Sequence, residues 1–135
     1  MKTVYILRGV PGCGKSTLAE ELTSNNRSSV ICSADDYHTH DGKYVWDESS
    51  SHTAHLWCMQ LFEENLKDET EIIIVSNTNV KHRDIKYYRN LALEYDYKVF
   101  VLVIENWHEG VNTHDVPEDV LKRMENSIKS NIKLR

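Results

Sequence analysis

The sequence predicts an α/β fold in three layers, with a four-stranded, mostly parallel sheet flanked by helices. Two observations lead to this prediction. Strand and helix signals alternate along the 135 residues, which is typical of parallel strands joined by helical crossovers. The expected strands are short apolar runs without polar alternation, as strands buried on both faces are. A chain of this length forms one domain, which we expect to span residues 1–135.

The strands are expected where β-branched and other apolar residues cluster between turn or helix signals. The four predicted strands are Thr3–Arg8, Val30–Ser33, Glu71–Ser76 and Lys98–Ile104. The helices between them are predicted at Lys15–Ser24, Ser49–Lys67 and Lys81–Tyr95. The third helix has the clearest buried face, because its apolar residues recur at i, i+3 and i+4 spacing. These residues are Ile85, Tyr88, Leu91, Ala92 and Tyr95.

A final helix is expected to begin within Val116–Asp119. Pro117 suits the first turn of a helix, and the two acids that follow it are favoured at the positive end of the helix dipole. The residues expected to pack inward from this helix are Val120, Leu121, Met124 and Ile128.

The turn between the first strand and the first helix carries the strongest functional signal. Residues 9–16 have the pattern G-x-x-x-x-G-K-S, which is the P-loop or Walker A motif in its strand–turn–helix context. Such a loop binds phosphate with its N–H groups and predicts a P-loop NTPase that takes a nucleoside triphosphate with Mg²⁺. We expect Lys15 to contact the β- and γ-phosphates and the Ser16 hydroxyl to bind Mg²⁺. The other expected nucleotide-binding residues are Gly12, Cys13, Gly14 and Thr17.

Two long segments, 34–48 and 105–115, follow predicted strands and are expected to be loops at the carboxyl edge of the sheet, where ligands bind in open α/β folds. The second is expected to be a short, lid-like loop. In the first, Asp35 is the expected base for an acceptor hydroxyl, whereas Asp36 could cap a turn. Asn77 stands where many P-loop enzymes have an acidic metal ligand, so we expect a weaker metal partner or a turn residue there.

Some residue types have a structural and a functional interpretation. His55 lies near Trp57 in an apolar helix, and we expect a hydrogen-bonded imidazole in the core. Cys32 and Cys58 are expected to pack as small apolar residues. Trp46 could stack on a base or anchor its loop to the core.

The charge composition limits the kinds of molecule that the protein is expected to bind. The net charge is −5 and the basic residues are scattered, whereas proteins that grip long nucleic acids carry a basic stripe. A short nucleotide, a strand end or a small acceptor fits better than extended duplex. No apolar run approaches the ~20 residues that cross a bilayer, and we expect a cytoplasmic protein that does not act at a membrane.

The ordered motifs resemble those of P-loop kinase-like domains, the family of phage polynucleotide 5′-kinase and zeta-toxin-like kinases. The recurrent pattern is R-G-x-P-G-x-G-K-S, S-A-D-D-Y, G-x-Y-x-[FW]-D, A-H-x-W-C, N-T-N and V-P-E. It is matched here by Arg8–Ser16, Ser33–Tyr37, Gly42–Asp47, Ala54–Cys58, Asn77–Asn79 and Val116–Glu118. The resemblance spans nearly the whole chain.

The resemblance implies a kinase that moves the γ-phosphate of ATP to a hydroxyl, most plausibly the 5′-hydroxyl end of DNA or RNA. It gives Asp35 the role of general base and places His38, Asn79 and Arg83 on the substrate. His38 replaces an arginine of the phage enzyme. The 105–115 loop contains no arginine, so Arg123 is the nearest expected catalytic cation, with Arg83 next. A small-molecule or nucleoside kinase, or an ATP-binding protein with little transfer, remains an alternative.

Overall fold

The computed structural model describes residues 1–25, 28–40, 43–44, 50–107, 110, 115–132 and 134, without the side chains of 39, 40, 43 and 44. At its centre is a four-stranded sheet with the order β2-β5-β1-β6, in which all neighbouring strands are parallel. The strands are β1 (Thr3–Arg8), β2 (Ser29–Cys32), β5 (Ile72–Ser76) and β6 (Lys98–Val103). The predicted sheet is therefore confirmed, with every boundary within one residue.

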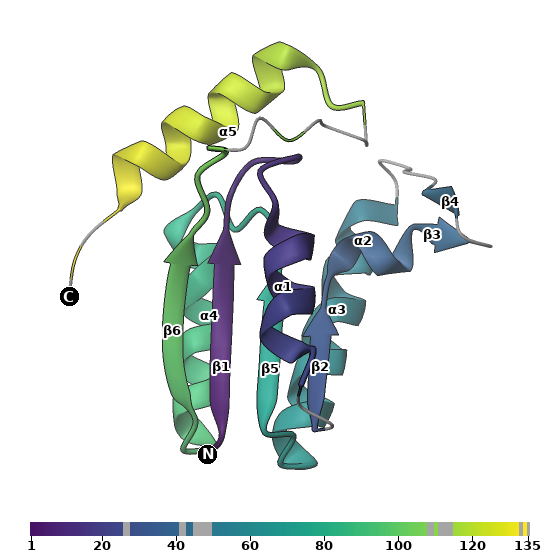
Figure 1. Cartoon of the computed structure of the whole chain (residues 1–135), viewed down its shortest axis with the longest axis vertical. Helices are drawn as coiled ribbons and strands as arrows, with labels where there is room; N and C mark the ends of the chain where they lie inside the picture. Colours follow the sequence, from purple (N-terminus) through teal and green to yellow (C-terminus); the bar gives the residue numbers. More distant parts are fainter. Residues whose placement is uncertain are drawn as a thin grey trace.

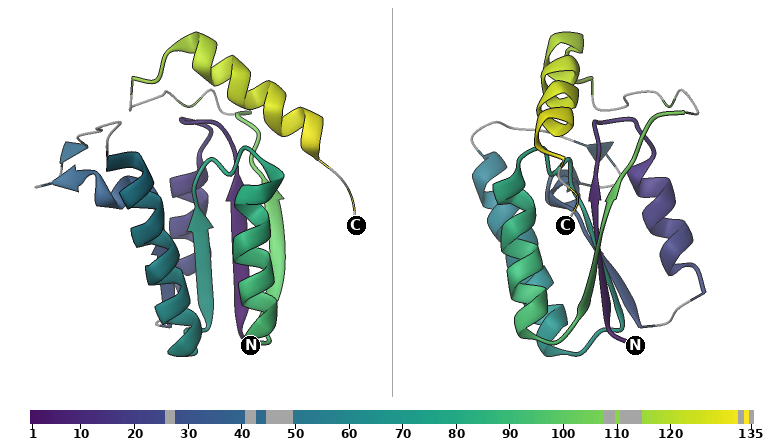
Figure 2. Two further views of the ribbon diagram at one scale, coloured as in Figure 1. Left: turned by 180° about the vertical axis from the view of Figure 1, so that it is seen from behind. Right: turned by 90° about the vertical axis from the view of Figure 1, so that its left-hand side faces the viewer.

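Three helices form the outer layers. Helix α1 (Lys15–Thr23) covers one face of the sheet, and α3 (Ser51–Lys67) and α4 (His82–Glu94) cover the other (Figure 2). Helix α5 (Glu118–Asn131) instead crosses above the carboxyl ends of the strands (Figure 1). The three-layer α/β architecture follows the prediction, and α5 adds a cover over the edge where ligands are expected.

The segment after β2 was expected to be a loop, and this prediction was wrong in part. It contains the four-residue helix α2 (Ala34–Tyr37) and the antiparallel strands β3 (Thr39–His40) and β4 (Lys43–Tyr44). Two acids in the first turn of α2 favour a helix there, because negative charge is stabilised at a helix N-terminus. Residues 41–42 and 45–49, with Trp46 and most of the expected G-x-Y-x-[FW]-D motif, lie outside the described residues.

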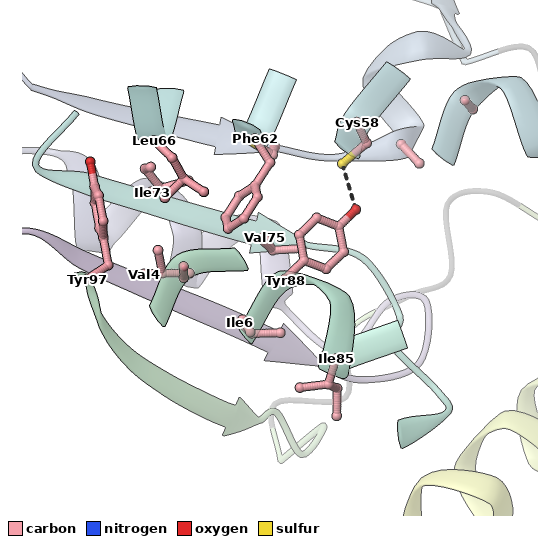
Figure 3. Close-up of a cluster of buried hydrophobic side chains, with 14 residues drawn as sticks. Val4, Ile6, Cys58, Phe62, Leu66, Ile73, Val75, Ile85, Tyr88 and Tyr97 are labelled. Atoms are coloured by element: carbon pink, nitrogen blue, oxygen red, sulfur yellow. Dashed lines mark hydrogen bonds between the residues drawn. The ribbon is translucent and has the colours of Figure 1, made fainter. Parts of the chain in front are cut away.

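The main core lies between the sheet and helices α3 and α4 (Figure 3). The rings of Phe62 and Tyr88 meet edge to face at 4.9 Å, and the Tyr88 hydroxyl donates a hydrogen bond of 3.5 Å to Cys58 Sγ. Burial raises the pKa of the Cys58 and Cys32 thiols, so both stay protonated. They act as the apolar packing residues that the sequence predicted. The predicted stripe of α4 is also confirmed, since Ile85, Tyr88 and Ala92 are buried.

Helix α5 is attached through its C-terminal end. Arg8, at the end of β1, is only 3% exposed. Its Nη2 donates to Asn131 Oδ1 at 2.5 Å and its Nε donates to the carbonyl of Asn79 at 2.8 Å. Of the predicted stripe of α5, Ile128 is buried, whereas Val120, Leu121 and Met124 are only half-buried. The first turns of α5 therefore leave apolar surface above the sheet edge.

Among the described residues, we find no helix with the length and apolar character needed to cross a membrane.

Candidate functional site

A cavity of about 1260 Å³ opens at the carboxyl edge of the sheet. The P-loop, the start of α2, the end of β5 and the first half of α5 all contribute to its walls. Its size exceeds the ~300–1,000 Å³ of a typical small-ligand pocket, which leaves room for a nucleotide and a second substrate. Lys15, Ser16, Asp35 and His38, which the sequence singled out separately, all line this one cavity.

The P-loop owes its shape to two glycines. Gly12 and Gly14 have φ values of 87° and 105°, a region that residues with a Cβ rarely enter. The loop then enters α1 directly at Lys15, so the first N–H groups of the helix have no partner within it. Both glycines, Ser16 and Thr17 line the cavity. The loop therefore presents N–H groups and a hydroxyl to the cavity, as an anion site requires.

Cys13 differs from the other residues expected to bind nucleotide. Its side chain is only 1% exposed and does not line the cavity. A Cβ on Gly9 would collide with its Sγ, and Lys15 Nζ lies 3.8 Å from the same sulfur, so the sulfur packs between these two residues of the loop. The side chain of Cys13 therefore packs inside the loop. Only its backbone is placed to take part in the phosphate-binding turn.

Lys15 is held inside the concave side of the loop. Its Nζ donates to the carbonyls of Gly9 and Val10 at 2.9 and 3.1 Å. Burial lowers the pKa of Lys15, while the charges of Cys13 and Asp35 act in the opposite direction. Lys15 and Asp35 thus line one cavity with opposite charges.

The orientation of Asp35 depends on the end of β5. Asn77 Oδ1 accepts a hydrogen bond of 2.8 Å from the backbone N–H of Ala34, the first residue of α2. Asn77 Nδ2 donates to Cys58 Sγ at 3.6 Å. Asn77 is thus an anchor between strand and helix. Asp36, the acid that follows Asp35, does not line the cavity. Its pKa is raised, mainly by burial and secondly by the charge of Asp35.

Asn79 and Arg123, both expected near the substrate, do not line this cavity. Asn79 is 4% exposed, has a positive φ of 47° and donates from Nδ2 to the carbonyl of Leu7 at 2.6 Å. Its amide therefore joins the loop after β5 to β1, which is a structural role. The Arg123 side chain is 75% exposed and lies 4.0 Å from Asp119. Arg83 and Asn79 both line a smaller, adjoining cavity.

His55 was expected in the core, and this prediction was wrong. It is exposed and lines both cavities. The spacing of the apolar residues in α3 indicates that His55 lies off the buried face of this helix. Ala54, Cys58 and Phe62 recur every four residues on the buried face of α3, and His55 is one position away from that stripe.

The expected lid-like loop is described at residues 105–107, 110 and 115, whereas His108 and His114 lie outside the described residues. Gly110 is fixed by Asn106, whose Oδ1 accepts from the Gly110 N–H at 2.7 Å and whose Nδ2 donates to its carbonyl at 3.1 Å. A Cβ on Gly110 would collide with the Gly12 carbonyl. This part of the loop therefore lies directly against the P-loop.

No group of three or more His, Cys, Asp or Glu side chains suited to a metal ion occurs in the described part of the chain. The cavity does contain oxygen donors in Ser16 and Asp35. This donor set fits Mg²⁺, which keeps several waters and uses few protein ligands beside substrate phosphates. It does not fit a metal that requires a complete cage of protein ligands.

Comparisons with known proteins agree with this geometry. A family model described as "AAA domain" matches residues 4–130. Human NEDD4-binding protein 2 is 34% identical over 128 residues, covering 90% of this chain but only 7% of the human protein.

Two solved structures share the fold. Pnkp1, in its complex with Rnl and Hen1, has a TM-score of 0.61 at 23% identity, over 90% of this chain and 38% of Pnkp1. The APS kinase CysC of Mycobacterium tuberculosis has a TM-score of 0.54 at 11% identity, over 95% of this chain and 97% of CysC. The four-stranded parallel sheet with flanking helices is thus a P-loop kinase-like fold.

Proposed function

This chain belongs to the AAA domain family, and from that premise we propose that it is an ATP-dependent kinase acting on a hydroxyl acceptor. The acceptor that we propose is the 5′-hydroxyl end of a short single-stranded DNA or RNA. One observation carries the proposal: the P-loop lysine, Lys15, and a carboxylate suited to be a base, Asp35, line the same cavity. Pnkp1, which has the same fold, comes from an RNA repair complex, and this supports a nucleic-acid acceptor.

The triphosphate is proposed to lie along the P-loop. Its oxygens would accept hydrogen bonds from the N–H groups at the start of α1, and Lys15 would exchange the carbonyls of Gly9 and Val10 for the β- and γ-phosphates. Ser16 is proposed to hold Mg²⁺, which supplies positive charge to the phosphates. Because Lys15 is half-buried, its charge is screened less by water than that of a fully exposed lysine.

The nucleobase is proposed to lie between α1 and α5. The apolar side chains of the cavity wall on this side are Leu18, Val116, Pro117, Val120 and Met124, and the charged residues Glu21 and Asp115 also line the cavity. A flat, weakly polar ring fits between such side chains, which bury its faces. This explains why the stripe of α5 is only half-buried at Val120 and Met124 while Ile128 packs fully.

The acceptor hydroxyl is proposed to approach from the side of α2. Its oxygen would attack the γ-phosphorus and lose its proton to Asp35, while the bond between the γ-phosphorus and the β,γ-bridging oxygen breaks and ADP leaves. The His38 side chain lines the same wall and is proposed to contact the acceptor. Positioning by these groups is the main source of rate in such transfers.

Arg123 is proposed as the cation for the transferring phosphoryl group. It precedes Met124, which lines the cavity, and its contact with Asp119 is long and exposed. Such an exposed ion pair is worth ~0.2–1 kcal/mol, so the side chain can change rotamer at small cost. If Arg123 acts in this way, its replacement by alanine lowers the transfer rate and leaves ATP affinity nearly unchanged.

The test uses ATP labelled on its γ-phosphate and 5′-hydroxyl oligonucleotides of several lengths. We expect transfer by the wild type, loss of transfer in Asp35→Ala, and loss of ATP binding by calorimetry in Lys15→Ala. Asp36→Ala is the matched control, because it removes the neighbouring carboxylate that does not line the cavity. Wild-type transfer in Asp35→Ala would refute the assigned base. ATP binding without transfer to any oligonucleotide would refute the acceptor.

The net charge of −5 favours one competing function, a kinase for a nucleoside or another small molecule, because an extended strand needs a cationic channel. ADP release measured with a panel of small hydroxyl compounds distinguishes it. An ATP-binding protein with little transfer is the third candidate, and normal ATP affinity with negligible ADP release from every acceptor would identify it.

A further inference from the structure

A second cavity of about 270 Å³ lies between α3, the first turns of α4 and the segment that follows β5. It shares three lining residues, His55, Asn77 and Thr78, with the large cavity. The two cavities are therefore neighbours on the side of the large cavity that α3 borders. A strand whose terminal hydroxyl lies at Asp35 can continue across Asn77 and Thr78 into this second space.

Among the described residues that line the second cavity, Arg83 is a cation available for a ligand. Arg83 is exposed and forms no hydrogen bond or ion pair with any other residue that the structure describes. Asp84, an acid that lines the same cavity, is engaged elsewhere, because its Oδ2 accepts from the Lys81 N–H at 3.0 Å and its charge acts on the buried Arg8. An arginine fork of this kind suits a phosphate group.

The same helix, α4, also offers an aromatic ring to this cavity. Tyr87 lies four residues after Arg83, so both side chains are on the same face of α4. Its ring is half-buried and packs edge to face against Tyr88 at 5.2 Å. A ring held in this way is a platform on which any base can stack. Arg83 is thus suited to the phosphate of a nucleotide and Tyr87 to its base.

We propose that this second cavity binds the phosphodiester and base that follow the accepting nucleoside of a single-stranded 5′-hydroxyl end. Arg83 contacts the phosphate and Tyr87 stacks on the base. This inference rests on the proposed function and names the part of the acceptor that the chain recognises. It also accounts for recognition by a protein of net charge −5, because one local cation suffices for a short single strand.

The test compares Arg83→Gln with Arg89→Gln, a control that removes the same charge from the same helix. Arg89 does not line the cavity, and its Nε donates to Asn90. Transfer is measured to a nucleoside, to a nucleoside 3′-phosphate and to 5′-hydroxyl di- and tetranucleotides. Binding of a fluorescent tetranucleotide is measured separately as a function of salt, so that one readout does not need transfer.

We expect Arg83→Gln to raise the KM of the phosphate-bearing acceptors about tenfold and to leave the nucleoside unchanged. The slope of log affinity against log salt should become shallower by about 0.7, and Arg89→Gln should change neither quantity. Equal effects of Arg83→Gln on all acceptors, or an unchanged salt slope, would overturn the inference. Arg83-dependent oligonucleotide binding without any transfer would support this site while refuting the proposed kinase function.

Discussion

Arg8 and Asn131 are joined by a hydrogen bond of 2.5 Å although 123 residues separate them in the chain. Arg8 is the last residue of β1 and directly precedes the P-loop, and Asn131 is the last residue of α5. Asn131 also donates to the carbonyl of Val80 at 2.8 Å, to which Arg8 Nη2 donates at 3.0 Å. Through these hydrogen bonds among Arg8, Val80 and Asn131, helix α5, which lies over the cavity, is attached to β1, the strand that leads into the P-loop.

We predict that Arg8→Lys lowers the free energy of unfolding by about 3 kcal/mol. A lysine cannot reproduce the fork that contacts Asn79, Val80 and Asn131, and it leaves buried carbonyls unsatisfied. Asn131→Ala should cost about 1 kcal/mol. Because the two residues share partners, the double variant should cost less than the sum of the singles. Urea unfolding of the four proteins measures this coupling, and strict additivity would show that the contact contributes nothing.

A second prediction concerns Asn77. Asn77→Ala removes the acceptor for the Ala34 N–H, so α2 is no longer anchored and Asp35 loses its orientation. We expect kcat for transfer to fall about 10- to 100-fold with little change in the KM for ATP. Asn77→Asp keeps an oxygen in the same place and should retain most of the activity. Equal losses in both variants would mean that Asn77 does not act through this hydrogen bond.

The sheet and the P-loop could be predicted from sequence because their signals are local. Apolar runs such as Ile72–Ser76 have few other uses, and the glycine pattern from Gly9 to Lys15 has a fixed stereochemical meaning. The predicted faces of α4 and the apolar role of Cys58 were confirmed for the same reason. In each case neighbouring residues determine the answer.

The roles of Asn77 and Asn79 depend on contacts between distant segments. Asn79 donates to Leu7, 72 residues away, and Asn77 accepts from Ala34, 43 residues away. An Asn after a strand is equally compatible with a metal ligand, a turn and an anchor, so sequence alone does not choose. The position of His55, by contrast, follows from the helical period of the apolar residues beside it, as the buried face of α4 does.

The carboxyl of Asp36 gives a prediction on pH. Its pKa is raised above the ordinary 3.8 by burial and by the charge of Asp35. At a pH between the ordinary pKa of the unfolded state and the raised pKa of the folded state, Asp36 holds a proton in the folded protein that it has lost in the unfolded protein. The free energy of unfolding therefore falls as pH rises through this range. Because Asp36 is exposed, solvent screens the effect, so Asp36→Asn should raise Tm only slightly at about pH 7 and change it even less at about pH 3. Glu20→Gln, the same charge change at an exposed position, is the control in thermal melts. An equal gain at both pH values would exclude ionisation as the cause.

The last prediction concerns the packing of Gly9 on Cys13. A methyl group at Gly9 would overlap Cys13 Sγ and would approach the Ile104 carbonyl to 3.0 Å. Gly9→Ala must therefore displace the P-loop, and overpacking of this kind costs ~1–3 kcal/mol. We expect ATP affinity, measured by calorimetry, to fall about tenfold or more, because a factor of ten corresponds to ~1.4 kcal/mol. Cys13→Ala alone should change ATP affinity less than Gly9→Ala does, since the buried side chain does not line the cavity and the contact between its Sγ and Lys15 Nζ is long, at 3.8 Å. Combined with Gly9→Ala, it removes the collision with Sγ and should restore part of the lost affinity, leaving only the close approach to Ile104. If the double variant binds ATP as poorly as Gly9→Ala, the sulfur does not limit the space at Gly9. The backbone carbonyl of Ile104, directly after β6, is then the limiting contact.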